Sequence, residues 1–213
     1  MSELSNYIRF TSANPRFNFS FLYPSVWQLR EVTGADYDEV FILGPRNKEN
    51  TYSLALAIRV TLSREKGGRY GSLEELIADH LARCQRSTGF QEISRAYGYL
   101  ADVEATEIEI GYTIPLPINT LNPQKTPIVE RRIFLKEGEY FYEVIYRAVK
   151  ENYYQYLEAF KDVVRTFEFR YATAQRVYRP LVMPAPAYAV HEHPAEYRAD
   201  GRESQRTPPE RNG

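Results

Sequence analysis

Apolar and polar residues alternate along several stretches of the chain at the two-residue period of a β-strand. In residues 17–23, the aromatic rings of four alternate residues share one face of the predicted strand. Pro24 lacks the amide proton that a sheet ladder needs, so it ends this strand, and Trp27 follows as a core candidate. A face of four rings must be buried, and we expect the rest of the chain to cover it.

The same period recurs in later stretches of the chain. Further strands are predicted at residues 40–43, 52–62, 91–99, 103–114, 128–136 and 139–148, with a short edge strand at 7–10. The last two long strands flank Glu137 and Gly138, which favour a hairpin turn. Polar residues alternate with apolar ones in most of these strands, which is typical of an antiparallel sheet with one face toward water.

Two segments change to the spacing of an amphipathic helix. Residues 72–86 begin with Ser72 and place Glu75 three positions later, which predicts a capping box. Residues 152–167 begin with Asn152 as the predicted N-cap and carry apolar residues at spacings of three and four. The sequence therefore predicts an α+β fold, in which an antiparallel β-sheet of about six or more strands is sandwiched between helices as α/β/α layers.

The composition changes after the second helix. We expect one globular domain over residues 1–172 and a disordered, proline-rich tail over residues 173–213, in which both signs of charge are mixed. A long loop is predicted at residues 115–127, because this stretch carries four prolines and no periodicity. Long ordered loops are often functional. The candidate partner surface on this loop comprises Leu116, Ile118, Asn119, Leu121 and Asn122.

The overall composition limits the classes of function. The chain has 213 residues, of which 43% are hydrophobic, and eighteen tyrosines favour half-buried strands. A net charge of -1 gives no global field for nucleic acid, so no nucleic-acid partner is expected. The first residues show no basic segment followed by an apolar run, and no stretch has transmembrane length. We therefore expect a cytoplasmic protein that does not span a membrane.

Two groups of residues have types that bind metals. His191, Glu192 and His193 place two imidazoles on one side of an extended chain, but a structural site needs about four ligands that are held in place. The acidic residues of positions 36–39 lack the glycine and the distal glutamate of an EF-hand loop, so a solvated turn is expected there. No cofactor is predicted from these residues.

The side chains that could catalyse a reaction also have structural explanations. Cys84 and His80 lie on the apolar face of the first predicted helix, where a thiol behaves as a small hydrophobe. Glu104, Glu107 and Glu109 alternate along a strand, as residues of a solvent-facing side would. No nucleophile elbow, dinucleotide fingerprint or Walker loop is present. We expect a protein that is not an enzyme.

Basic residues gather in and after the last predicted hairpin. They are Arg131, Arg132, Arg147 and Lys150, and aromatic residues lie between them, as in a platform for single-stranded nucleic acid. Glu130, Glu139 and Glu143 cancel most of the field of these cations. Cross-strand ion pairs are therefore the predicted role of the charges.

Three motifs occur in an order that resembles a known family. Residues 23–25 with Trp27 form a Tyr-Pro-Ser-x-Trp turn after the phenylalanine-rich strand, residues 70–75 read Tyr-Gly-Ser-Leu-Glu-Glu at a helix start, and Thr166-Phe167 closes the last helix. Together with the element order, they resemble the PsbP family of extrinsic photosystem II proteins across roughly residues 17–169. The resemblance implies an antiparallel sheet between helices.

The resemblance also implies a function. PsbP proteins are non-enzymatic and bind the lumenal face of photosystem II, where they support calcium and chloride retention, and relatives assist photosystem assembly. This implies a protein complex as partner, a thylakoid lumen location and calcium as the one implied cofactor, with peripheral membrane association through the partner. Proteins of similar fold include a Ran-binding transport factor and cytosolic secretion chaperones. The alternative function is therefore a cytosolic carrier or chaperone-like module that binds an apolar peptide or a small molecule.

Overall fold

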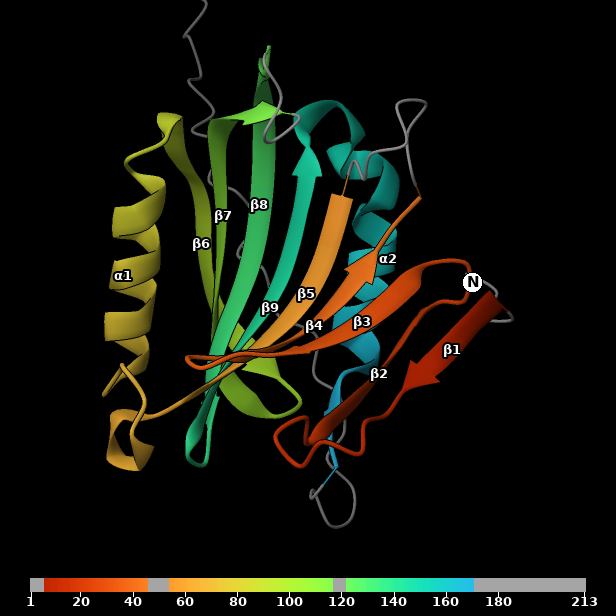
Figure 1. The fold of residues 1–213 in the computed structure, drawn as a ribbon, viewed down its shortest axis with the longest axis vertical. Coiled ribbons are helices and arrows are strands. Elements are labelled where there is room, and N and C mark those ends of the chain that lie inside the picture. Colours follow the sequence, from red (N-terminus) through yellow and green to blue (C-terminus); the bar gives the residue numbers. More distant parts are fainter. Residues whose placement is uncertain (1–5, 46–53, 117–121, 171–213) are drawn as a thin grey trace, which may run out of the picture. The chain divides into compact units, whose positions relative to one another are not determined.

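A computed structural model describes residues 6–45, 54–116 and 122–170, which form two antiparallel sheets and two long helices (Figure 1). The elements are β1 (Tyr7–Phe10), β2 (Phe19–Pro24), β3 (Gln28–Thr33), β4 (Asp38–Leu43), β5 (Leu54–Leu62), α1 (Leu73–Cys84), β6 (Thr88–Leu100), β7 (Val103–Leu116), β8 (Gln124–Glu137), β9 (Tyr140–Val149), α2 (Tyr153–Thr166) and β10 (Glu168–Phe169). The predicted tail at 173–213, with His191, Glu192 and His193, lies outside the described residues.

The larger sheet has seven strands in the order β3-β4-β5-β9-β8-β7-β6, and every neighbouring pair is antiparallel. A three-stranded sheet has the order β1-β2-β10. The predicted α+β class with an antiparallel sheet of more than six strands is confirmed. In this order, β3 and β6 are the two edge strands of the larger sheet.

The two helices cover opposite faces of the larger sheet (Figure 1). On one face, Leu76 and Ile77 of α1 pack with Ile108 of β7 and Phe134 of β8. On the other face, α2 and the three-stranded sheet build the larger core, to which Phe160 contributes. The prediction of one face toward water was wrong, because both faces carry a buried core beneath a cover.

The phenylalanine-rich strand lies in the smaller sheet rather than in the larger one. Phe19 and Phe21 of β2 are fully buried, and the ring of Phe19 lies 5.3 Å from Phe167 and 6.1 Å from Tyr142 of β9. The cover of these rings is therefore the larger sheet together with α2. Of the two long helices, α2 covers this strand, and α1 lies on the opposite face of the larger sheet. Trp27 is 9% exposed, and its ring lies 6.1 Å from Tyr156, so its predicted core position is confirmed.

The predicted helix starts are correct in position but differ in their hydrogen bonds. Ser72 accepts a hydrogen bond from the amide of Glu75, as a capping box requires. The Glu75 carboxylate accepts from the amide of Gly71 instead of that of Ser72, so the reciprocal bond is shifted by one residue. Asn152 is the N-cap of α2, but its side chain makes no capping bond, because a 3-10 turn at Lys150–Asn152 leads into the helix.

The predicted loop at 115–127 is shorter in the structure. Strand β7 continues to Leu116 and β8 begins at Gln124, and these two residues are paired. Antiparallel pairing accommodates Pro115 and Pro127 opposite Lys125 and Thr113. Pro115 and Pro127 therefore lie within the paired strands of a long hairpin rather than in a loop.

Candidate functional site

The partner surface predicted on the 115–127 loop is only partly described. Leu116 is half-buried at the end of β7, and Asn122 is exposed just before β8. Ile118, Asn119 and Leu121 lie outside the described residues. Leu116 packs at the margin of the core beneath α1, so it is part of the hairpin rather than of a free loop.

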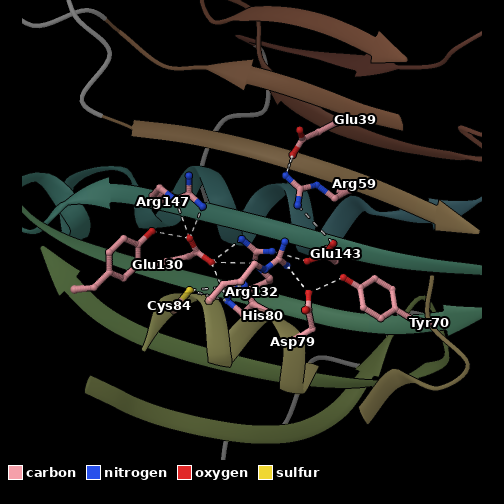
Figure 2. Close-up of polar contacts among 12 residues, drawn as sticks. Glu39, Arg59, Tyr70, Asp79, His80, Cys84, Glu130, Arg132, Glu143 and Arg147 are labelled. Atoms are coloured by element: carbon pink, nitrogen blue, oxygen red, sulfur yellow. Dashed lines mark hydrogen bonds and ion pairs between the residues drawn. The ribbon is translucent and has the colours of Figure 1, made fainter. Parts of the chain in front are cut away.

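A buried ionic network lies between α1 and the sheet, and Figure 2 shows its members. Glu130 of β8 is 0% exposed and occupies the centre. Its Oε1 atom accepts a hydrogen bond of 2.9 Å from Nε of Arg132, and its Oε2 atom accepts one of 2.7 Å from Nε of Arg147. The hydroxyl of Tyr112 donates to the same Oε2 atom at 2.9 Å, and Nε2 of His80 lies 3.3 Å from Oε1. Glu130 therefore has four partners from three strands and one helix.

The network continues across the sheet toward β4 (Figure 2). Arg132 also donates a hydrogen bond to Glu143 of β9. Glu143 lies 3.9 Å from Arg59 of β5, which pairs with Glu39 of β4 at 3.0 Å. The three carboxylates Glu39, Glu130 and Glu143 therefore balance the three guanidinium groups Arg59, Arg132 and Arg147.

The protonation states in this network follow from burial and neighbouring charge. Burial raises the pKa of Glu130, but Arg132 and Arg147 outweigh burial and hold that pKa well below its usual range. Burial lowers the pKa of His80 more than the Glu130 carboxylate raises it. His80 is thus neutral, and its Nε2 must carry the proton to donate to Glu130. Each charged group of this network therefore lies beside a group of opposite charge.

Cys84 is the one cysteine of the chain and lies next to this network. Its sulfur is 3.7 Å from Nε2 and 3.8 Å from Nδ1 of His80. Burial raises the pKa of the Cys84 thiol, and the Glu130 carboxylate raises it further. The nucleophilic form is a thiolate, so this environment opposes reactivity. The sequence-based interpretation of Cys84 and His80 as structural residues agrees with this geometry.

A second, smaller ionic cluster lies on the α2 side of the sheet. Arg131 of β8 donates to Glu109 at 2.6 Å and lies 3.2 Å from Glu107. The hydroxyl of Tyr153 on α2 donates to Glu109 at 2.8 Å. Glu107 and Glu109 were expected to face solvent, which was wrong, because α2 covers them and they are 6% and 8% exposed. Glu104, the third residue of this set, is exposed.

The arginines of the last hairpin form the predicted cross-strand ion pairs. Arg147 lies directly opposite Glu130 in the ladder of β8 and β9, and Arg131 lies opposite Glu109 in the ladder of β7 and β8. Glutamates on the neighbouring strands therefore neutralise the charges of these two arginines.

The acidic turn at residues 36–39 does not gather its carboxylates. Asp38 pairs with Arg16 at 3.0 Å on the α2 side, while Glu39 points to the other face and pairs with Arg59. Asp36 is exposed. Among the residues that the structure describes, no cluster of three or more His, Cys, Asp or Glu side chains is arranged to hold a metal ion. The prediction of a solvated turn is wrong for Asp38 and Glu39, which are 1% and 2% exposed.

A cavity of about 310 Å³ lies where the N-terminal segment meets the end of β10. Ser12, Asn14, Phe17, Asn18 and Arg170 contribute to its lining. The alternative function, a carrier, requires an apolar pocket. Strand β5 carries mostly small residues on the α1 side of the sheet. On that face, the side chain of Arg59 reaches Glu39 and Glu143, so the space above β5 holds part of the network.

Strand β6 carries three of the large apolar side chains that are exposed in the described residues. Ile93, Tyr97 and Tyr99 are 47%, 69% and 45% exposed. Within this strand of thirteen residues, only Ala96 and Leu100 are buried. Beyond β6, the seven-stranded sheet has no further strand within the described part of the chain. The outer backbone edge of β6 and its exposed apolar side chains can thus contact the same partner, so β6 is the candidate site.

The sequence pattern missed this site. Tyr97 and Tyr99 are two residues apart, as Tyr140 and Tyr142 of β9 are, yet Tyr142 is only 2% exposed. Strand order decides the difference, because β9 lies between two neighbours and β6 has one. The segment Ala96-Tyr97-Gly98-Tyr99, in which two tyrosines lie beside small residues, was the indication of this site in the sequence.

Neither helix in the described residues is long and apolar enough to cross a membrane. No protein-family model and no curated protein sequence matches the chain. The comparison with known proteins therefore rests on solved structures.

Three solved structures show a general likeness of fold. Cyanobacterial PsbP from Synechocystis has a TM-score of 0.49 and 11% identity, with 77% of this chain and 92% of that chain covered. A protein from Bacteroides thetaiotaomicron has a TM-score of 0.47 and 16% identity, with 78% of this chain covered, and this chain spans about half (49%) of its length. A protein of unknown function from Pseudomonas aeruginosa has a TM-score of 0.44 and 9% identity, with coverages of 81% and 99%. The likeness concerns the fold and assigns no partner.

Proposed function

We propose that this protein is a non-enzymatic binding module that engages another protein chain through the edge of β6. The observation that carries the proposal is the exposure of Ile93, Tyr97 and Tyr99 along an edge strand of thirteen residues. Tyrosine is enriched at protein interfaces because its ring buries a large area while its hydroxyl finds a polar partner. An exposed edge adds backbone hydrogen bonds to such a contact.

The opposite edge of the same sheet supports this choice. Strand β3 has six residues, and charged Arg30 and Glu31 stand at its centre. Short length and charge are the usual means by which a sheet edge avoids pairing. Strand β6 is about twice as long, and its charged residues Glu92 and Arg95 pair with each other at 2.9 Å.

The non-enzymatic part of the proposal is supported by the side chains that carry ionisable groups. Glu130, Arg132 and Glu143 are almost completely buried and satisfy one another. Burial raises the pKa of the Cys84 thiol, which lowers its nucleophilicity at neutral pH. An extrinsic subunit or assembly factor of photosystem II, as the PsbP resemblance implies, would be one specific form of such a module.

Site-specific photo-cross-linking in cells of the source organism tests the proposal. A photoreactive phenylalanine analogue replaces Tyr97 in one variant and Tyr154 in a matched control. Tyr154 is 79% exposed on α2, so it is at least as accessible as Tyr97. We expect discrete cross-linked proteins, identified by mass spectrometry, from position 97 and none in common from position 154. Equal labelling from the two positions, or none from position 97, would refute the proposal.

A further inference from the structure

We infer that the chain which occupies the β6 edge is a second copy of this protein, paired antiparallel to form a sheet continuous across two molecules. The inference rests on the proposed function and names the partner of that same edge. It follows from the arrangement of charged and aromatic side chains along β6, which is complementary to itself.

The faces of β6 are set by its register with β7. Arg95 lies opposite Ile108, and Tyr97 lies opposite Thr106, so both side chains project to the α1 side of the sheet. Register shifts between Thr88 and Gln91 and between Glu92 and Ser94 change the alternation in the first half of the strand. As a result Glu92 also projects to the α1 side, opposite Ile110.

The charged residues of β6 form an ion pair within one molecule. Nε of Arg95 donates to Oε1 of Glu92 at 2.9 Å, and both side chains are about one-third exposed, at 34% and 36%. Phe90 packs against the core beneath α1, so it lies on the same side as this pair. Along the strand, the α1 side of β6 therefore presents, in order, the ring of Phe90, the carboxylate of Glu92, the guanidinium of Arg95 and the ring of Tyr97.

A two-fold axis through the centre of β6 places this order of side chains opposite the same order read in the reverse direction. Each ring then faces a ring, and each charge faces the opposite charge. When Glu92 of one copy stands opposite Arg95 of the other, the symmetry places Arg95 opposite Glu92 a second time. The same register sets Phe90 of each copy opposite Tyr97 of the other. Opposite charges and aromatic pairs directly across an antiparallel ladder each stabilise it. A thirteen-residue strand gives an edge about 44 Å long for this pairing.

Charge-reversal variants of the full chain test the pairing. Glu92→Arg gives a chain with two cations at the contact, and Arg95→Glu gives a chain with two anions. Alone, each variant sets like charges opposite each other in the homodimer, so we expect the dimer dissociation constant to rise roughly tenfold to a hundredfold. Mixed in equal amounts, the two variants set opposite charges across both contacts, and a heterodimer should form with near wild-type affinity.

Comparing the mixture with each variant alone distinguishes the contact between two copies from the ion pair within one copy. The ion pair inside the molecule is broken in both variants and stays broken after mixing, so recovery reports the contact between copies alone. The matched control is the exposed pair of Glu158 and Lys161 on α2, which has the same spacing of three residues. Glu158→Lys and Lys161→Glu should leave dimerisation unchanged, alone and mixed.

Analytical ultracentrifugation over a concentration series supplies the readout, and circular dichroism verifies that each variant is folded. Tyr97→Ser is a further variant that removes a ring without changing charge, and it should weaken the dimer. A wild-type chain that stays monomeric, or a mixture that does not restore dimers, would overturn the inference. If position 97 then still cross-links to a different protein, the proposed function stands without the second copy, whereas loss of all cross-links at position 97 removes the function itself.

Discussion

Strands β8 and β6 distribute polar and apolar side chains in opposite ways. Strand β8 buries Glu130 and Arg132 in the centre of the sheet, whereas β6 exposes Tyr97 and Tyr99 at its margin. On β8, every buried charge has a partner of opposite sign, which stabilises one register of the strands. On β6, the rings of Tyr97 and Tyr99 are 69% and 45% exposed. Charged side chains are thus paired in the interior of the sheet, whereas aromatic side chains stay exposed at its edge.

The largest expected effect comes from removing a buried charge. Arg132→Ala leaves Glu130 and Glu143 buried without their shared partner, and we expect the free energy of unfolding to fall by about 3 to 5 kcal/mol. Denaturant titration measures the change. The matched control on the edge is Arg95→Ala, which breaks a partly exposed pair and should lower stability by less than about 1 kcal/mol. Equal losses from the two variants would show that the network is not structural.

A buried ring and its exposed neighbour provide the second comparison. Trp27→Ala removes a side chain that is 9% exposed and contacts Tyr156, so stability should fall by about 3 to 5 kcal/mol. Val26, the preceding residue, is 85% exposed, and Val26→Ala should change stability by no more than about 0.5 kcal/mol. Thermal unfolding of both variants checks this. An unchanged melting temperature for Trp27→Ala would place the ring outside the core.

The turn that joins β6 to β7 carries strain that can be relieved. Ala101 and Asp102 have φ angles of 49° and 62°, in the left-handed region that favours glycine. Ala101→Gly removes the clash of the Cβ atom with the backbone, and we expect stability to rise by about 1 kcal/mol. Denaturant titration detects the gain, and Ala105→Gly on the adjacent strand should instead lower stability because Ala105 is buried. A loss for Ala101→Gly would contradict the assigned turn.

The smallest effect at neutral pH concerns His80. Because burial lowers the pKa of folded His80, the unfolded chain binds a proton below about pH 6.5 that the folded chain does not, and stability falls as pH decreases. Near pH 7 both states are mostly neutral, so the contribution to stability is small. Glu130 and Arg132 of β8 and Glu143 of β9 face this ring. In His80→Gln, the loss of stability between pH 6.5 and 5 should be shallower than in the wild type. An unchanged slope would contradict a buried neutral histidine.

The sequence predicts the fold class because a period of two indicates strands, and spacings of three and four indicate amphipathic helices. The hairpin at Gly138 and the start of α1 at Ser72 follow from local chemistry, namely a φ of +58° and a side-chain cap. The burial of Glu107 does not follow, since a strand with alternating glutamates has the same pattern whether a helix covers it or water does. Its ion pair with Arg131 depends on the register of β7 with β8.

The candidate site is harder to predict than the fold for the same reason. The rings of Tyr97 and of Tyr142 occur in similar patterns, yet one is exposed and the other is buried. Only the strand order, which brings β5 and β8 to either side of β9 and leaves β6 outermost, distinguishes them. That order depends on contacts between segments far apart in the chain, which local periodicity does not contain.

Amide hydrogen exchange at two protein concentrations tests the β6 edge most directly. At high concentration, pairing with a second copy would protect the outward-facing amides of β6, while the amides of the short edge strand β3 would exchange at an unchanged rate. We predict slower exchange in β6 alone at the higher concentration, and this difference should disappear in Glu92→Arg. Exchange in β6 that is the same at both concentrations would contradict the pairing of β6 with a second copy.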